Sequence, residues 1–291
     1  MVNHRGFGER LFNVFNVIFL TLIGLSALLP FIYIVSASFS SEEVVAKGTF
    51  LLFPTDVSLV AYKYIFSTNT LVRSMMISFY VTVAGTLINL LLTSLMAYPL
   101  AHHRLRGRRT LLILVLFTML FTGGLIPTYI VVKSLGLINS LWALMIPNAI
   151  SAFNLIILKN FFQQIPDGLQ ESAKIDGAND LRILLSIVLP LSAPALATFA
   201  LFYAVGHWNS YFNAIIYLND SDKWPIQVML RQIVILAQSG FADSASLDDT
   251  ILPAETVKMA VITFATVPIL MVYPFLQKHF AKGVLLGSVK G

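Results

Sequence analysis

The chain has 291 residues, of which 57% are hydrophobic and 11% charged, and its mean hydropathy is +0.81. A soluble domain carries roughly 25% charged residues, so this chain has too few charges to cover a water-soluble globule of its size. Lipid is the natural solvent for so much apolar surface, which indicates a polytopic membrane protein. The absence of cysteine excludes disulfides, thiolate nucleophiles and thiolate metal sites.

A helix that crosses a bilayer needs about 20 mostly apolar residues. We therefore predict an all-α membrane protein with six transmembrane helices, at residues 12–36, 74–100, 110–132, 138–158, 187–215 and 257–277. The first apolar run has no charge from Leu11 to Ser36, whereas the apolar core of a secretory signal has about 7–15 residues. We expect an anchor, although the small residues 36–38 leave a cleaved signal open as an alternative.

The basic residues predict the orientation. If both termini are cytoplasmic, 12 of the 19 Lys and Arg residues fall on that side, and the densest cluster, Arg104 to Arg109, lies between the second and third spans. The positive-inside rule then predicts a multi-pass membrane protein with both ends in the cytoplasm. The cluster serves as a topology signal, with binding of lipid head groups or nucleic acid as the alternatives; we expect no nucleic-acid partner.

The predicted spans lack the charges that most ion-coupled transporters carry. All the acidic residues lie outside the spans or at their ends, and no Lys or Arg lies in the middle of one. Proton- and ion-coupled transporters usually keep an ionisable group near the midplane, although backbone carbonyls can bind sodium without one. The nearest approach to a P-loop, Gly283 to Gly291, has the wrong spacing. Any uphill transport is therefore expected to draw its energy from a partner.

No catalytic constellation is evident. His102 and His103 are adjacent, so on a helix they point about 100° apart and do not share a metal. The spans contain many serines, but no G-x-S-x-G motif. We therefore predict that the chain is not an enzyme and has no catalytic residue, metal site or cofactor of its own, and an intramembrane enzyme is the disfavoured alternative.

The segment 165–194, on the predicted cytoplasmic side, has a distinctive pattern. Asp167 followed by Gln170 resembles a capping box, Gly177 is suited to a left-handed helix stop, and Asn179 or Asp180 can restart a helix. We predict a short helix of about ten residues at the membrane surface, ending in a glycine bend. A short stiff helix between two spans can transmit movement from a soluble partner. From periodicity alone, an ordinary interfacial connector explains the pattern equally well.

This segment closely resembles the EAA loop of ABC importer permeases, in which Glu-Ala-Ala is followed by Gly and later by Ile-x-Leu-Pro. The matching residues are Glu171, Ala173, Asp176, Gly177, Ala178, Ile187, Leu189, Pro190 and Pro194. Ser172 replaces the second motif position, one small residue for another. The resemblance extends over about residues 70–280. The stretches 206–214 and 282–291 resemble the maltose-type, carbohydrate-importing branch, and within it the permeases for polysaccharide-derived oligosaccharides of Gram-positive bacteria.

The resemblance implies a type I ABC importer permease fold with a cytoplasmic coupling helix at 167–178 that docks in a cleft of the ATPase subunit. It also implies a location in the bacterial plasma (inner) membrane. The implied ATPase-coupling residues are Glu171, Ser172, Ala173, Asp176, Gly177, Ala178 and Pro190. The implied partners are a second, different permease subunit, two ATPase subunits that bind ATP and Mg, an extracytoplasmic solute-binding protein and an oligosaccharide. The implied regions are a cytoplasmic N-terminus (1–10), a first transmembrane helix (11–36), an extracytoplasmic loop (37–70), a permease core (71–277) and a cytoplasmic tail (278–291).

Two further features bear on the transport path. The third span contains Gly123, Gly124 and Pro127, which suggest a broken or closely packed end. The fifth span contains aromatic and amide side chains that are candidates for a sugar path: Trp208, Asn209, Tyr211, Phe212 and Asn213. An interfacial aromatic belt explains the rings without any sugar. Two other functions stay open, a permease of the same superfamily for a non-sugar solute and a stand-alone secondary transporter.

Overall fold

The computed structural model describes residues 7–238 and 254–288, and the secondary structure of these residues is helical apart from one isolated bridge between Ser40 and Val57. The chain divides into two compact units. Unit 1 comprises Met1–Asn69 and Leu230–Thr266, and unit 2 comprises Thr70–Met229 and Val267–Gly291. Two helices, α14 (Ile226–Gln238) and α15 (Ala254–Ser288), are divided between the units, and α4 (Asn69–Ala101) has its first residue in unit 1 and the rest in unit 2.

Unit 1 contains α1 (Phe7–Ser38), α2 (Glu42–Ala46) and α3 (Val60–Ser67). Nothing within the structure buries the apolar window of α1, as expected of a helix that faces lipid or a partner. Its end is fixed by a small core in which Ala37, Val45 and Leu51 are buried. Glu42 accepts hydrogen bonds from the backbone nitrogen (3.1 Å) and the hydroxyl (2.8 Å) of Thr256. The small residues at 36–38 are therefore buried and serve this packing.

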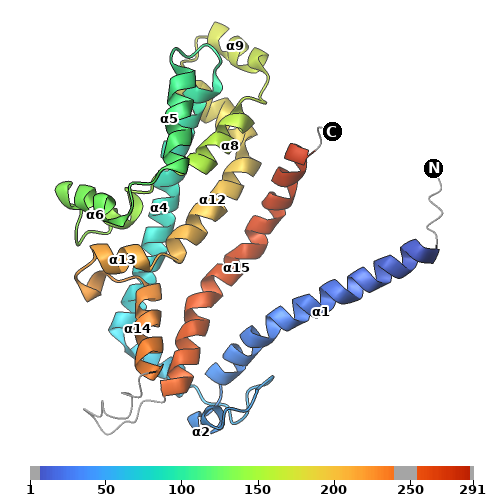
Figure 1. Cartoon of the computed structure of the whole chain (residues 1–291), viewed down its shortest axis with the longest axis vertical. Helices are drawn as coiled ribbons and strands as arrows, with labels where there is room; N and C mark the ends of the chain where they lie inside the picture. Colours follow the sequence, from blue (N-terminus) through green and yellow to red (C-terminus); the bar gives the residue numbers. More distant parts are fainter. Residues whose placement is uncertain (1–6, 239–253, 289–291) are drawn as a thin grey trace. The chain divides into compact units, whose positions relative to one another are not determined.

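Unit 2 is built along α4 (Asn69–Ala101), which runs beside α5 (Arg108–Leu120), α8 (Ala152–Phe162) and α12 (Ala193–Trp208) (Figure 1). One face of α4 is buried and consists mainly of small and polar side chains. They are Ser74, Ser78, Gly85, Thr86, Asn89, Thr93, Ser94 and Ala97. Small residues let helices approach closely in a membrane, where packing and hydrogen bonds replace the hydrophobic drive between helices.

The remaining helices of unit 2 are short. They are α6 (Leu125–Ser134), α7 (Trp142–Met145), α9 (Asp167–Ile175), α10 (Asp180–Ile183), a π-helical turn (Leu184–Val188), α11 (Leu189–Leu191), α13 (Phe212–Tyr217) and a 3₁₀ turn (Ser221–Lys223). The end of unit 2 that carries α9 has its own core, in which Phe162, Val188 and Phe199 are buried. A second core contains Met145, Tyr217 and other buried residues around α7 and α13.

Three of the six predicted spans are single helices in the structure, and the other three are each divided into shorter helices. Predicted spans 12–36, 74–100 and 257–277 lie inside α1, α4 and α15. The third predicted span is broken into α5 and α6, which are bent by 118° relative to each other. The break lies at Gly123 and Gly124, as predicted, and Gly124 has a positive φ of 84°.

The fourth and fifth segments are broken as well. The fourth contains the short α7 and the 11-residue α8, with Pro147 in the connection. The fifth bends by 85° at the start of α12, next to Pro194, and its helix ends at Trp208. The described residues thus contain three helices long and apolar enough to cross a membrane, or up to five if each bent pair is one span.

Candidate functional site

The start of α9 differs from the predicted capping box. Pro166 occupies the N-cap with extended backbone, and Asp167 is the first helical residue, without a side-chain capping bond. The carboxylate of Asp167 still stabilises the helix through the partial positive charge of its N-terminus. Gln170 does not reach back to the cap, because its side chain is turned into the protein and is buried. The prediction that Asp167 caps the helix is therefore wrong.

The end of α9 is as predicted. Gly177 has a φ of 82°, the left-handed conformation that glycine adopts without strain. The backbone nitrogen of Ala178 donates to the carbonyl of Ala173 (2.9 Å), and that of Gly177 to the carbonyl of Lys174 (3.0 Å). These two bonds form a Schellman motif, which satisfies carbonyls at the helix end. The predicted glycine stop is confirmed.

The chain then turns into the next helices. The Oδ1 atom of Asn179 accepts a hydrogen bond from the backbone nitrogen of Arg182 (2.8 Å), so Asn179 caps α10 as predicted. An ion pair between Lys174 and Asp180 (2.9 Å) spans the bend, although both side chains are about half exposed and such pairs contribute little stability. Pro190 lies just after the π-helical turn, where its missing N–H removes one helical hydrogen bond.

The structure brings six of the seven predicted coupling residues together, from Glu171 to Ala178, while Pro190 lies separately on α11. Glu171 and Ser172 are exposed on α9, whereas Ala173 and Ala178 pack against the core at this end of unit 2. Sequence reasoning missed Ile175, which is 87% exposed. An isoleucine between charged residues on a predicted surface helix was the available signal.

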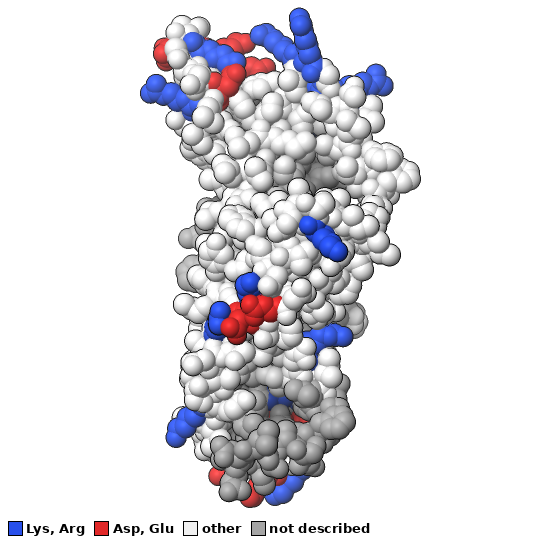
Figure 2. Space-filling model, turned by 90° about the vertical axis from the view of Figure 1, so that its left-hand side faces the viewer, with Lys and Arg blue, Asp and Glu red and all other residues white. Residues whose placement is uncertain are grey.

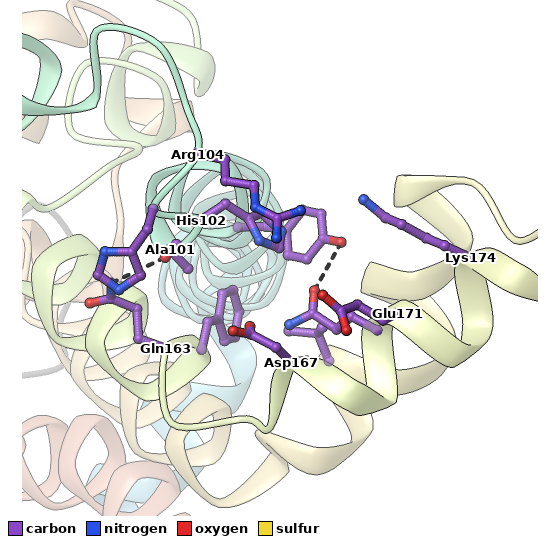
Figure 3. A pocket seen from close by; sticks show the side chains of 12 residues that line it. Ala101, His102, Arg104, Gln163, Asp167, Glu171 and Lys174 are labelled. Atoms are coloured by element: carbon purple, nitrogen blue, oxygen red, sulfur yellow. Dashed lines mark hydrogen bonds between the residues drawn. The ribbon is translucent and has the colours of Figure 1, made fainter.

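A cavity of about 350 Å³ lies between α9 and the end of α4. Figure 3 shows Asp167, Glu171 and Lys174 along its α9 side, with His102 and Arg104 opposite them. Charged side chains gather at this end of unit 2, and the surface that follows is mostly uncharged (Figure 2). This end of unit 2 therefore carries a polar surface built from α9 and the residues that follow α4.

His102 and His103 have different surroundings. The His102 ring meets Tyr98 edge to face, with ring centroids 4.8 Å apart, and its Nε2 has no hydrogen-bond partner among the described residues. Burial, assisted by the nearby charge of Lys174, lowers the pKa of His102 below its ordinary 6.5. His103 instead hydrogen-bonds Gln163, which also donates to the carbonyl of Ala101 at the end of α4.

The five predicted path residues lie at the end of α12 and the start of α13. Trp208 is buried (5% exposed) inside the protein, so in this conformation its ring faces neither lipid nor a solute. The side-chain amide of Asn209 donates to the carbonyl of Val205 (3.0 Å). Tyr211 and Asn213 are half-buried, and Phe212 is exposed. The exposed ring of Phe212 fits either the sugar path or the aromatic belt.

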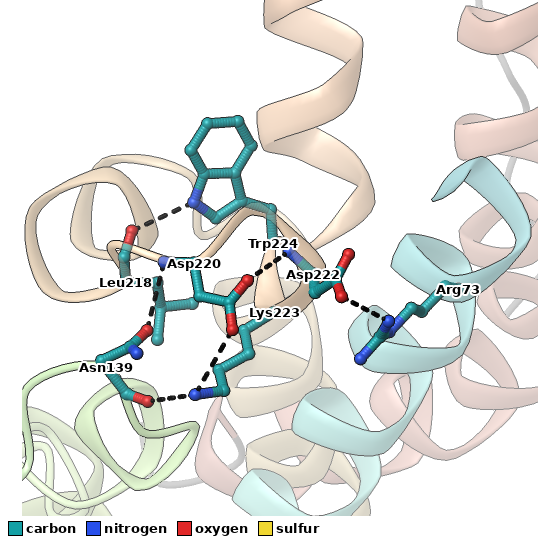
Figure 4. Close-up of polar contacts among 7 residues, drawn as sticks. All are labelled: Arg73, Asn139, Leu218, Asp220, Asp222, Lys223 and Trp224. Carbon is teal, nitrogen blue, oxygen red and sulfur yellow. Dashed lines mark hydrogen bonds and ion pairs between the residues drawn. The ribbon is translucent and has the colours of Figure 1, made fainter. Parts of the chain in front are cut away.

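A set of polar contacts that the sequence did not reveal joins α4 to the segments around α7 and α13. We call it the Asn139 clasp; it consists of Arg73, Asn139, Asp220, Asp222 and Lys223 (Figure 4). Arg73 pairs with Asp222 at 2.8 Å. The Oδ1 atom of Asn139 accepts from the backbone nitrogen of Asp220 (3.2 Å), and its carbonyl accepts from Lys223 Nζ (2.9 Å). Asn139 has a positive φ of 60°, which asparagine tolerates better than most residues.

The long apolar helices, the broken spans and the polar end that carries α9 define a polytopic helical membrane permease. The sequence matches the family described as "Binding-protein-dependent transport system inner membrane component" over residues 2–286. The chain belongs to this family, and its fold is that of a type I ABC importer permease.

Named relatives agree with this assignment. The chain is 59% identical over 284 residues to the polygalacturonan/rhamnogalacturonan transport system permease protein YtcP of Bacillus subtilis (strain 168), covering 97% of this chain and 99% of that protein. It is 54% identical over 288 residues to protein LplC of the same organism, covering 99% and 98%. A crystal structure of a bacterial ABC transporter involved in the import of the acidic polysaccharide alginate matches with a TM-score of 0.88 and 35% identity, covering 94% of this chain and 98% of that chain.

Proposed function

We propose that this chain forms half of the transmembrane path of a binding-protein-dependent ABC importer for oligosaccharides, and that α9 is its coupling helix. The observation that carries the proposal is the structure of α9, a nine-residue helix with exposed Glu171 and Ile175 that is joined to α10 by a rigid glycine turn. A helix of this kind suits a groove in a partner, with apolar anchors and a polar contact.

The proposed mechanism is mechanical. Ile175 and Leu169 supply apolar contacts to the ATPase subunit, and Glu171 supplies a charged one. ATP and Mg bind to the partner ATPase subunits and not to this chain. Closure of the ATPase pair moves α9, and the Gly177 turn passes this movement to α10–α12. The permease pair then changes between inward-facing and outward-facing states, an equilibrium biased by the nucleotide that the partner holds.

The proposed substrate is an oligosaccharide derived from an acidic polysaccharide. The relative at 59% identity is named for polygalacturonan and rhamnogalacturonan, and the matching crystal structure concerns alginate. Polygalacturonan, like alginate, is a polymer of uronic acids. An extracytoplasmic binding protein delivers the sugar, and a second, different permease subunit completes the path. Of the five path candidates, all but the buried Trp208 keep exposed or half-buried side chains: Asn209, Tyr211, Phe212 and Asn213.

The proposed topology has six membrane passages and two cytoplasmic termini. Each bent pair, α5 with α6 and α10–α11 with α12, makes one passage, and α8 with its preceding segment makes another. Arg104, in the basic segment between α4 and α5, lines the same cavity as Lys174 (Figure 3), and this gathering of basic residues supports a cytoplasmic location for that end.

The test is to purify the chain with the products of neighbouring genes and to reconstitute it in vesicles. ATP hydrolysis and uptake are measured with binding protein loaded with oligogalacturonides, alginate oligomers, neutral malto-oligosaccharides or amino acids. We expect ATP-dependent uptake of one acidic oligosaccharide class. Stimulation by an amino acid alone would favour the non-sugar permease, and uptake without ATP would favour the secondary transporter.

A further inference from the structure

The coupling helix is attached to the membrane helices by a buried polar contact. Of the nine residues of α9, all within the described part of the chain, Gln170 alone is buried. Its Oε1 accepts a hydrogen bond from the hydroxyl of Tyr98 on α4 (3.4 Å), and Tyr98 is equally buried, with each residue 7% exposed. A buried amide is unfavourable unless it is paired, so an apolar side chain would be the simpler choice if Gln170 served packing alone.

The contact between Tyr98 and Gln170 is packed on one side and open on the other. The ring of His102 holds Tyr98 from one side, while the cavity of about 350 Å³ lies beside Gln170. The cavity leaves room beside the contact, so α9 can move towards α4 while the two side chains stay paired.

Further along, α4 is joined to α12 by two polar contacts. The hydroxyls of Thr93 and Tyr203 lie 2.8 Å apart, and Asn89 Nδ2 lies 3.1 Å from His207 Nε2. Thus α9 has two connections to α12: directly along the chain through the Gly177 turn, and through Tyr98 and α4.

We propose that Tyr98 and Gln170 are positioning residues that transmit the displacement of α9 to α4, so that α4 and α12 move together when the ATPase subunits close. This inference rests on the proposed role of α9 as the coupling helix. A transmission role predicts a loss of coupling that exceeds any loss of stability, and a double-mutant cycle separates the two.

The variants are Tyr98→Phe, Gln170→Leu and the double variant, in the full complex with binding protein. Each single change removes one partner of the hydrogen bond and leaves the other buried without it. The double change replaces both partners with apolar groups of similar shape, which restores stability if the contact serves packing alone. Matched controls are Tyr80→Phe, an exposed tyrosine on α4, and Gln164→Leu, an exposed glutamine just before α9. The readouts are the thermal unfolding midpoint and the number of sugars imported per ATP hydrolysed.

We expect each single variant to lower the number of sugars imported per ATP about three- to tenfold. The double variant should show an equally low ratio, although its unfolding midpoint returns towards that of the wild type. The two controls should match the wild type in both readouts. Recovery of coupling together with stability in the double variant, or unchanged coupling in all three, overturns the inference. A wild-type complex that hydrolyses no ATP in response to sugar overturns the proposed function itself, so the two failures are distinguishable.

Discussion

At the scale of single residues, Gly85 determines how closely α4 and α12 approach. A Cβ at this position would lie 2.5 Å from Nε2 of His207 and under 3.0 Å from two other ring atoms. The ring would have to move, and its hydrogen bond with Asn89 would be lost. We predict that Gly85→Ala destabilises the protein by about 1–3 kcal/mol, the usual cost of overpacking, measured by thermal unfolding in detergent.

The matched control for this change is Gly206→Ala on α12, where an added Cβ meets nothing within 4 Å. Alanine there should be neutral or slightly stabilising, because glycine is the poorer helix former by about 0.5–1 kcal/mol. Adding His207→Ala to Gly85→Ala should recover part of the loss, since the clash disappears. Equal stability of the Gly85 and Gly206 variants would contradict the close-packing interpretation.

His102 predicts a response to acid. Its pKa lies below 6.5 mainly because the ring is buried, and Lys174 adds to the effect while Asp180 and Asp167 oppose it. The folded state therefore binds a proton less readily than the unfolded state. The resulting loss in the free energy of unfolding is absent well above pH 6.5. It grows as the pH falls through that value towards the lower pKa of the folded state. His102→Gln should reduce the loss of thermal stability between pH 7.5 and 5.5; an unchanged loss would contradict the assignment.

At the scale of elements, the turn after α9 depends on one glycine. Gly177→Ala places a Cβ in the left-handed region, at a cost of roughly 1–2 kcal/mol. Gly168→Ala is the internal control, because Gly168 lies in the helix with no other atom near an added Cβ. We expect stimulated ATP hydrolysis and thermal stability to fall in the first variant and to be kept or improved in the second. Equal behaviour would mean that the turn geometry has no influence on coupling.

The Asn139 clasp gives a second prediction at this scale. Asn139→Gly keeps the positive φ but removes the Oδ1 acceptor for the nitrogen of Asp220, whereas Asn139→Ala loses the acceptor and adds backbone strain. Stability should fall in the order wild type, glycine, alanine, with a further loss of about 1–2 kcal/mol in the last step. Thermal unfolding of the three proteins provides the measurement, and an alanine variant as stable as the glycine variant would contradict it.

The sequence predicted some parts of these elements and missed others for identifiable reasons. Gly177 and Asn179 marked the turn after α9 correctly, because their backbone preferences are local. The N-cap was wrong, because Pro166 fixes its own backbone and Gln170 is recruited by Tyr98, which lies 72 positions away. The Asn139 clasp joins residues that lie far apart in the chain, such as Asn139 and Lys223, 84 positions apart, or Arg73 and Asp222, and no local pattern encodes such contacts.

At the scale of the whole molecule, composition was enough to predict a polytopic membrane protein. Hydropathy windows did not predict that three of the six apolar segments are broken. A hydropathy window sums the transfer free energies of the residues and contains no term for the backbone conformation. Gly124 and Pro147 were the visible signals for two of these breaks. The exposed apolar surface of α1 and the exposed side chain of Ile175 have no covering partner among the described residues, and the proposed function assigns lipid and other subunits to them.

The most direct test of the central claim, that α9 docks on an ATPase subunit, uses the absence of cysteine from this chain. A photoreactive maleimide is attached to Ile175→Cys on α9, or to Ser221→Cys in the Asn139 clasp region, with the cysteines of the partner subunits replaced. Illumination of the assembled complex should give a permease–ATPase adduct from position 175 and none from position 221. An assembled complex that yields no such adduct from position 175, or yields it equally from position 221, would contradict the account.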